Sequence, residues 1–261
     1  MLLKEWAFLG NYDFYTNKLK VLATNELPPE KWSYAGKNDF GILRNYLYYT
    51  FEKLWQEREA ANEEEKQQII YMDENAACFN TGLYDKTWQP IYFYCVKNPI
   101  EGFQPWRFTS FYNSYTIKFS NIPTAAVSGL RRANYFSDPS SLIFDINLEI
   151  VPQWNHILYD EENFLRIPEQ LRANGKDFCQ NLIDGAIRSV KKRIEANYKT
   201  IVPQQFNGKI QLLAPLYLTN PDTADLALVL SVYYGHTCLT TEMAYNNARL
   251  IARPDSYWLQ P

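Results

Sequence analysis

The sequence has few of the residues that build metal centres and disulfide-stapled folds. Its 261 residues include four cysteines and two histidines. The cysteines are scattered, and they form no CxxC pair and no zinc-binding pattern with the histidines. A structural zinc site is therefore not expected. Scattered thiols are typical of a protein that works in a reducing compartment.

Long apolar runs and high-specificity motifs are also absent. No stretch of about 18 apolar residues occurs, so no transmembrane helix is expected. Lys4 and Glu5 interrupt the first apolar stretch, which argues against a secretory signal. The motifs GxxxxGK[ST], GxGxxG, HExxH and GxSxG are missing, which removes the commonest NTPase, dehydrogenase, zinc protease and α/β-hydrolase interpretations. We expect a cytoplasmic protein with no membrane partner.

Aromatic residues are abundant, and net charge is small. Aromatic residues make up 16% of the chain, with 20 Tyr, 15 Phe and 7 Trp. Most of these rings are expected in the core, and some can serve as stacking surfaces for bases. A formal net charge of −3 argues against indiscriminate nucleic-acid binding but is compatible with a local basic face.

The hydrophobic pattern predicts an α+β fold, with a mostly antiparallel or mixed sheet packed by several amphipathic helices. Residues 142–151 alternate apolar and polar side chains without a break, which predicts a central strand. Helices are predicted from residue 38 or 39 to about 58, from 174 or 177 to about 198, and over 242–252. Further strands are predicted at 69–72, 76–79, 90–96, 107–112, 209–213, 226–233 and 237–240.

The chain length allows one large domain or two closely fused ones. The period of the pattern changes from helical to strand-like near residue 69. We predict a single domain over residues 1–261, in which a helical part, 1–66, packs on an α+β body, 67–261.

Candidate catalytic residues come from the predicted strands. Asp145 and Glu149 share the polar face of 142–151, about 13 Å apart, so they can hold Mg²⁺ or Mn²⁺ only with other groups or water. They can equally line a solvent-exposed face. His156 is a candidate general acid or base, or a structural hydrogen-bond donor. Lys209 can neutralise developing phosphate charge beside Gln211, or it can protect a strand edge.

Candidate ligand-binding residues lie on the basic and amide-rich segments. Arg131 and Arg132 form either an anion clamp or a solvated pair. A concentrated basic surface lies on the helix predicted near residue 190 and on the segment after it. This surface either contacts the phosphates of a nucleic acid or is simply solvated. It comprises Arg188, Lys191, Lys192, Arg193 and Lys199. Asn246, Asn247 and Arg249 must face solvent or hydrogen-bond a ligand or a loop.

Several motifs together resemble a known family. They are Leu43-Arg44-Asn45-Tyr46-Leu47 with Thr50-Phe51, Phe79-Asn80-Thr81-Gly82-Leu83, Asn134-Tyr135-Phe136, Ala196-Asn197-Tyr198-Lys199 with Val202-Pro203-Gln204, Gly208-Lys209-Ile210-Gln211-Leu212-Leu213, and Met243-Ala244-Tyr245-Asn246-Asn247-Ala248-Arg249-Leu250. The set is similar to the DUF3825 family, a family of unknown function. Its members are often fused to RNA- or DNA-associated modules such as cold-shock-like domains, so the resemblance implies a nucleic-acid or nucleotide setting.

These features lead to one main hypothesis and two alternatives. The main one is a protein that acts on RNA or a nucleotide, with phosphodiester or phosphate chemistry if it is an enzyme such as a hydrolase or nuclease. In it, phosphates contact Arg131, Arg132, Lys199, Lys209 and Arg249; the base or sugar contacts Asn80, Gln211, Asn246 and Asn247; and Asp145 or His156 handles protons. The alternatives are a non-catalytic RNA-binding module and a protein-interaction component of a defence or stress pathway.

Overall fold

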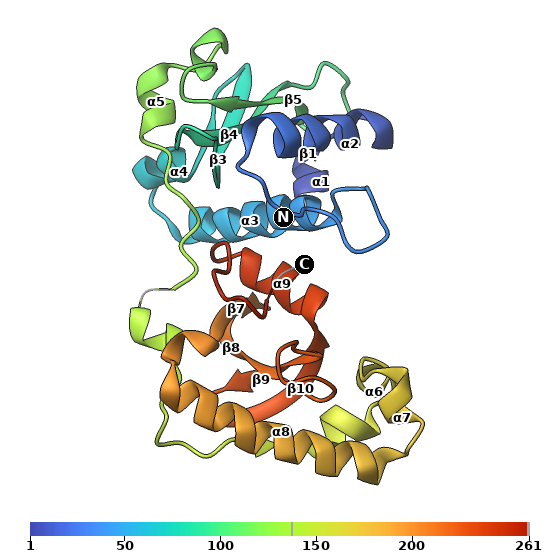
Figure 1. The fold of residues 1–261 in the computed structure, drawn as a ribbon. Coiled ribbons are helices and arrows are strands. Elements are labelled where there is room, and N and C mark those ends of the chain that lie inside the picture. The colour runs from blue at the N-terminus through green and yellow to red at the C-terminus, as the bar shows by residue number, and fades with distance from the viewer. Residues whose placement is uncertain (137, 260–261) are drawn as a thin grey trace. The chain divides into compact units, whose positions relative to one another are not determined.

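The computed structural model describes residues 1–136 and 138–259. The chain divides into two compact units, Met1–Asn134 and Tyr135–Pro261, and each unit contains its own five-stranded sheet (Figure 1). Each sheet combines antiparallel pairs with one parallel pair. The predicted α+β class with mixed sheets is therefore confirmed. The description of the whole chain as a single domain stays a prediction.

The first unit contains the elements from α1 to α5. These are α1 (Leu3–Trp6), β1 (Ala7–Phe8), α2 (Tyr12–Val21), the π-helix η1 (Leu22–Glu26), α3 (Gly41–Ala60), α4 (Glu63–Ile69), β2 (Ile70–Met72), β3 (Ala76–Tyr84), β4 (Pro90–Lys97), β5 (Trp106–Asn113), the 3₁₀ helix η2 (Ile117–Phe119) and α5 (Thr124–Ser128). The strand order is β1-β5-β4-β3-β2. The predicted hairpin at 69–79 and the strands after it are confirmed.

An aromatic core joins α3 to this sheet. One face of α3 is buried, with Leu47, Phe51 and Leu54 among its residues, and the Phe51 ring lies 5.4 Å from Phe79 of β3. Phe79 in turn stacks on Phe93 of β4 at 4.8 Å. A second buried cluster, with Cys78 and Val127 among its members, covers the other face of the sheet. Both faces are therefore closed, as expected for strands with nearly continuous apolar sequence.

The second unit contains the remaining elements. These are the 3₁₀ helix η3 (Pro139–Leu142), β6 (Val151–Pro152), the π-helix η4 (Asn155–Tyr159), α6 (Glu161–Phe164), α7 (Glu169–Arg172), α8 (Lys176–Ala196), the 3₁₀ helix η5 (Tyr198–Thr200), β7 (Val202–Phe206), β8 (Lys209–Leu216), β9 (Leu226–Ser231), β10 (Tyr234–Thr240) and α9 (Thr241–Arg249). The strand order is β6-β10-β9-β8-β7.

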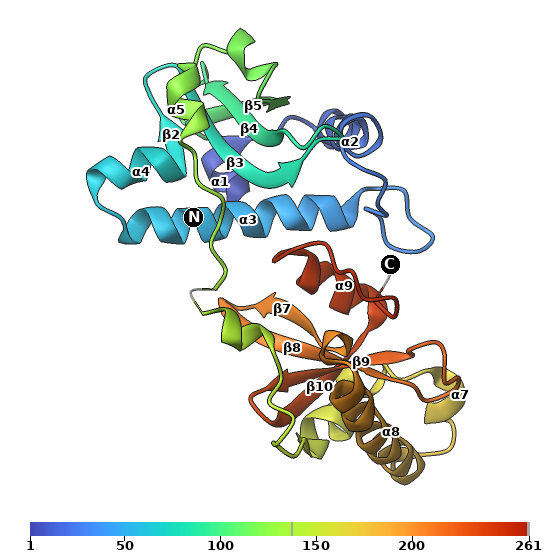
Figure 2. The same ribbon diagram turned by 60° about the vertical axis from the view of Figure 1, so that its left-hand side comes forward.

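Two helices sandwich the second sheet. Figure 2 shows α8 on one face of the strands and α9 on the other. Apolar residues recur every four positions in α8 and predict its buried face; they are Phe178, Leu182, Ala186, Val190 and Ile194. Ala186, Val190 and Ile194 are buried against the sheet, but Phe178 is 43% exposed and the neighbouring Cys179 takes the core position. In the part of the chain that the structure describes, no helix is long and apolar enough to span a bilayer.

The central strand predicted over residues 142–151 is wrong. Between the end of η3 at Leu142 and the start of β6 at Val151, the chain is irregular. It turns at Asp145, whose Oδ1 accepts hydrogen bonds from the backbone N–H and Nδ2 of Asn147 at 3.0 and 2.9 Å. Short polar side chains of this kind compete with strand pairing by bonding to the nearby backbone. Phe144 and Ile150 still reach the core of the second unit, whereas Ile146 of the same alternation is 45% exposed, so the alternation agrees with burial only in part.

Candidate functional site

Cross-strand register gathers polar and aromatic side chains on the α9 side of the second sheet. Lys209 pairs with Phe206 across a turn in which Asn207 and Gly208 both have positive φ, 48° and 77°, as a type I′ hairpin requires. Gln204 pairs with Gln211, and the β8–β9 and β9–β10 registers continue this row through Ser231 to Tyr234. We call this surface the polar face; it comprises Gln204, Phe206, Lys209, Gln211, Ser231 and Tyr234.

A chain of hydrogen-bonded amides runs through the polar face. Gln204 Nε2 donates to Gln211 Oε1, and Gln211 Nε2 donates to Ser231 Oγ, both at 3.0 Å. From α9, Asn247 Nδ2 donates to Gln204 Oε1 at 3.2 Å, and Asn246 Nδ2 lies 3.4 Å from Asn247 Oδ1. Gln204 is only 1% exposed. The amide chain therefore fixes these side chains before any ligand arrives.

The rings of the polar face are open to solvent. Phe206 is 51% exposed and Tyr234 is 39% exposed. The turn before Tyr234 holds the β-branched Val232 at φ 57°, a strained conformation of the kind that concentrates at functional sites. Tyr233 donates a hydrogen bond to Tyr234 at 3.1 Å, and this contact raises the pKa of Tyr233.

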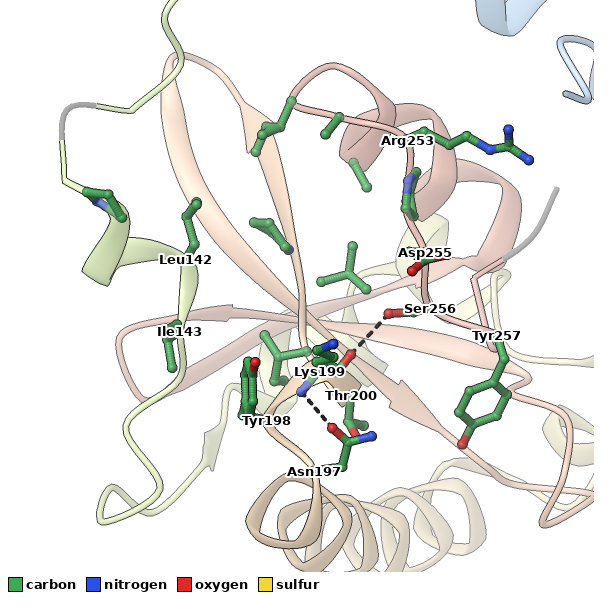
Figure 3. Close-up of a pocket in the computed structure, with 18 residues that line it drawn as sticks. Leu142, Ile143, Asn197, Tyr198, Lys199, Thr200, Arg253, Asp255, Ser256 and Tyr257 are labelled. Carbon is green, nitrogen blue, oxygen red and sulfur yellow. Dashed lines mark hydrogen bonds between the residues drawn. The ribbon is translucent and has the colours of Figure 1, made fainter. Parts of the chain in front are cut away.

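A pocket of about 670 Å³ lies elsewhere on the second unit. Its walls come from three segments: the 3₁₀ helix η3 with Ile143, residues 197–203, and the chain from Ala248 to Tyr257. Figure 3 shows Tyr198 beside Ile143 on one side, Tyr257 on the other, and Arg253 directed away from the pocket centre. The two tyrosines are 62% and 67% exposed. This volume is typical of small-molecule sites.

Hydrogen bonds fix the pocket floor. Ser256 Oγ donates to the Lys199 carbonyl at 3.0 Å, and Asn197 Oδ1 accepts from the Lys199 N–H at 3.1 Å. The Tyr257 hydroxyl lies 3.2 Å from that of Tyr217. Burial raises the pKa of Tyr217, and this hydrogen bond raises it further. Lys199 is the predicted ligand-binding residue that lines this pocket.

The three predicted catalytic residues are spread over the second unit. Lys209 lies in β8, and the exposed His156 follows β6. Because β9 and β10 separate these strands, β6 and β8 are about 14 Å apart at the usual strand spacing. Asp145 stabilises its own turn. The structure does not bring these three side chains together.

The predicted metal ligands are also separate. Glu149 forms an ion pair with Lys191 of α8 at 2.5 Å, whereas Asp145 bonds to Asn147. Over residues 1–136 and 138–259, no group of three or more His, Cys, Asp or Glu side chains is placed to hold a metal ion. A metal role for Asp145 and Glu149 stays a prediction.

Three predicted ligand-binding residues lie in the first unit. Asn80 is buried, and its Nδ2 donates to the Leu130 carbonyl at 3.2 Å, so it anchors the segment that carries both arginines. Arg131 is 3.6 Å from Glu65 and donates to Gln68 at 2.7 Å. Arg132 is exposed, and its guanidinium lies over the Tyr84 ring at 5.4 Å.

Five predicted ligand-binding and catalytic residues lie on or beside α9 and the polar face. They are Lys209, Gln211, Asn246, Asn247 and Arg249, the last with a half-buried side chain on α9. Sequence reasoning missed Gln204, Phe206 and Tyr234. The Asn207-Gly208 pair was the available signal, because Asn-Gly between strands predicts a hairpin that places Phe206 opposite Lys209. Tyr198 begins the three-residue 3₁₀ helix η5 and Tyr257 lies in a turn, and such short elements carry no periodic signal that would identify them.

Comparison with known proteins gives one match. The sequence model of a family described as a domain of unknown function (DUF3825) matches residues 23–258. No curated protein and no solved structure matches the chain. Because the match spans most of both units, the chain belongs to the DUF3825 family.

Proposed function

We propose that the second unit binds single-stranded RNA on its polar face. The observation that carries this proposal is the pairing of an exposed ring, Phe206, with a lysine, Lys209, directly across the β7–β8 hairpin. A base can stack on the ring while the ammonium group contacts a phosphate, which is the usual mode of binding single strands. Tyr234 provides a second exposed ring on the same face.

The amide chain supports recognition of base edges. Each glutamine amide has two N–H donors and an oxygen with two lone pairs. Gln211 uses one donor on Ser231 and one lone pair on Gln204, so a donor and an acceptor remain. Gln211 is half-buried and held in one orientation. It is therefore suited to a hydrogen bond with a base that lies on the face.

The arrangement favours binding ahead of cleavage. Catalysis of phosphodiester cleavage needs proton-transfer groups within hydrogen-bond reach of the reacting atoms. Asp145 and His156, the predicted proton-transfer residues, lie on other segments than Lys209. We also propose a cytoplasmic location, supported by four cysteines that are all unpaired and buried.

The test is binding of an end-labelled 12-nucleotide single-stranded RNA, measured by fluorescence anisotropy at two salt concentrations. Phe206→Ala removes the stacking ring, and we expect affinity to fall about 5- to 100-fold, since one stacked base contributes about 1–3 kcal/mol. Lys209→Ala is expected to weaken binding and to lower the salt slope by about 0.7. The matched controls are Phe178→Ala and Lys192→Ala, because α8 covers the opposite face of the sheet.

The outcomes separate the three hypotheses for this chain. Wild-type affinity in both Phe206→Ala and Lys209→Ala contradicts the polar-face proposal. Cleaved RNA in the presence of Mg²⁺ or Mn²⁺, lost in Asp145→Asn or His156→Ala, would establish catalysis in place of simple binding. Absence of any RNA binding by the wild-type protein would favour a protein-interaction role. Single-stranded DNA of the same sequence tests the choice of nucleic acid.

A further inference from the structure

The turn between β3 and β4 presents a tryptophan to solvent. Trp88 is 75% exposed, the highest value for a large apolar side chain among the described residues. Its φ is 63°, in the left-handed region that side chains with a Cβ rarely adopt. A bulky ring is therefore held outward in a strained backbone conformation, and such strain persists only where the surroundings impose it.

Asp85 imposes this conformation. The carboxylate is buried, and its Oδ1 accepts hydrogen bonds from the N–H and Oγ1 of Thr87 and from the N–H of Gln89, at 2.8, 2.8 and 2.9 Å. Its Oδ2 accepts from Asn113 Nδ2 at 3.0 Å. The Trp88 N–H donates to the Asp85 carbonyl at 3.0 Å. These hydrogen bonds fix the backbone of the turn, so the point from which the Trp88 side chain projects is set before a ligand binds.

A second ring lies beside Trp88, with one cation over that second ring and another in the turn itself. The Tyr84 ring centroid is 6.3 Å from that of Trp88, and the exposed Arg132 guanidinium lies 5.4 Å from the Tyr84 centroid. Lys86 Nζ donates to the carbonyls of Thr24 and Asn25, which fix its position and leave its charge unneutralised. Aromatic rings next to positive charges suit a nucleotide, because the base can stack on a ring while its phosphate contacts a cation.

We propose that Trp88, Tyr84 and Arg132 form a second binding site for a base of single-stranded nucleic acid, on the first unit. In this site a base stacks on Trp88, and the adjoining phosphate contacts Arg132. Asn80 acts as a positioning residue, because its bond to the Leu130 carbonyl anchors the chain before Arg132. The site shares its ligand class with the polar face, but none of its residues.

The test uses Trp88→Gly, because glycine adopts positive φ without strain. The variant removes the ring and relieves the strain of the positive φ, which offsets the greater freedom of glycine in the unfolded chain, so its urea midpoint is expected to match that of the wild-type protein. Its affinity for the labelled 12-nucleotide RNA is expected to fall about 5- to 100-fold. The matched control is Phe103→Ala, which removes another exposed ring, 66% exposed, from a loop of the first unit.

Arg132→Gln adds an electrostatic readout. Loss of one phosphate contact is expected to lower the slope of log affinity against log salt by about 0.7, while Phe103→Ala leaves the slope unchanged. Trp88→Gly with reduced stability would mean that the ring packs structurally, and would overturn the proposal.

Comparison with the polar face keeps the two proposals distinct. Wild-type affinity in Trp88→Gly, with a loss in Phe206→Ala, overturns the Trp88 site and leaves the polar face in place. A loss in Trp88→Gly, with none in Phe206→Ala or Lys209→Ala, supports the Trp88 site and contradicts the polar face. A wild-type protein that binds no RNA overturns both, and a protein-binding role for the exposed ring would then replace this one.

Discussion

Replacing Gln204 by alanine tests whether the amide chain stabilises the second unit. Gln204 is 1% exposed and makes two side-chain hydrogen bonds, to Gln211 at 3.0 Å and from Asn247 at 3.2 Å. Each such bond contributes about 1 kcal/mol net, and the lost methylene contributes about 0.8 kcal/mol. We therefore expect Gln204→Ala to lower the free energy of unfolding by about 3 kcal/mol.

Urea denaturation, followed by circular dichroism, measures this change. With a slope of about 2 kcal/mol per molar urea, the midpoint for the second unit is expected about 1.5 M lower. Gln205→Ala is the matched control, since Gln205 is the next residue of β7, pairs with Ile210 and projects from the opposite face. Equal midpoints for the two variants would refute the reasoning. Combination with Asn247→Ala should be non-additive by about 1 kcal/mol.

Two further predictions concern the backbone and the thiols. Gly82 has φ 76°, and a Cβ there would lie 2.8 Å from the Tyr46 hydroxyl. Gly36 has φ 72° with open space around it, so Gly36→Ala is expected to lower the free energy of unfolding by about 1–2 kcal/mol through backbone strain alone. Gly82→Ala adds the steric contact and should destabilise the first unit by more than that. Equal urea midpoints would contradict this. Burial raises the pKa of Cys78 and Cys95 from 9.0, and that of Cys238 to about 12. Above about pH 9 these thiols lose their protons in the unfolded chain but keep them in the folded protein. The free energy of unfolding should therefore fall by about 1.4 kcal/mol per pH unit for each thiol. A urea midpoint that does not change between about pH 8.5 and 10.5 would contradict this.

Elements with a strong local pattern could be predicted from the sequence. The α3 helix carries an apolar stripe at helical spacing. Six residues predicted for this stripe are buried, and the seventh, Trp55, is half-buried; the six are Leu43, Tyr46, Leu47, Thr50, Phe51 and Leu54. Strands β4 and β8 begin at the predicted residues, Pro90 and Lys209. In these segments the pattern of burial and the intrinsic preference of the residues agree, so local reasoning is sufficient.

Other features depend on contacts that a linear pattern does not contain. Residues 142–151 alternate like a strand, yet Asp145 turns the chain by bonding to Asn147. The four-residue repeat of apolar residues in α8 predicted Phe178 on the buried face, but Cys179 packs into the core instead. Asn80 and Arg131 are predicted to contact a ligand, and the structure adds contacts of both within the protein that the sequence did not indicate; their ligand role stays a prediction.

The polar face shows the same limit at the level of the site. Lys209 and Gln211 were predicted to project from one side of a strand, and the register confirms it. Their partners Gln204 and Tyr234 come from other strands. Only the pairing of β7 and β10 with their neighbours places them nearby, and pairing is a long-range property.

The outer position of β7 has a consequence for self-association. An edge strand exposes unpaired backbone groups that can template pairing with another chain. Pro203, the second residue of β7, has no backbone N–H and therefore interrupts the row of donors along this edge. The same residue lines the 670 Å³ pocket. We expect Pro203→Thr to restore a continuous edge and to give concentration-dependent oligomers in light scattering, whereas the natural proline keeps adjacent molecules from joining sheet to sheet.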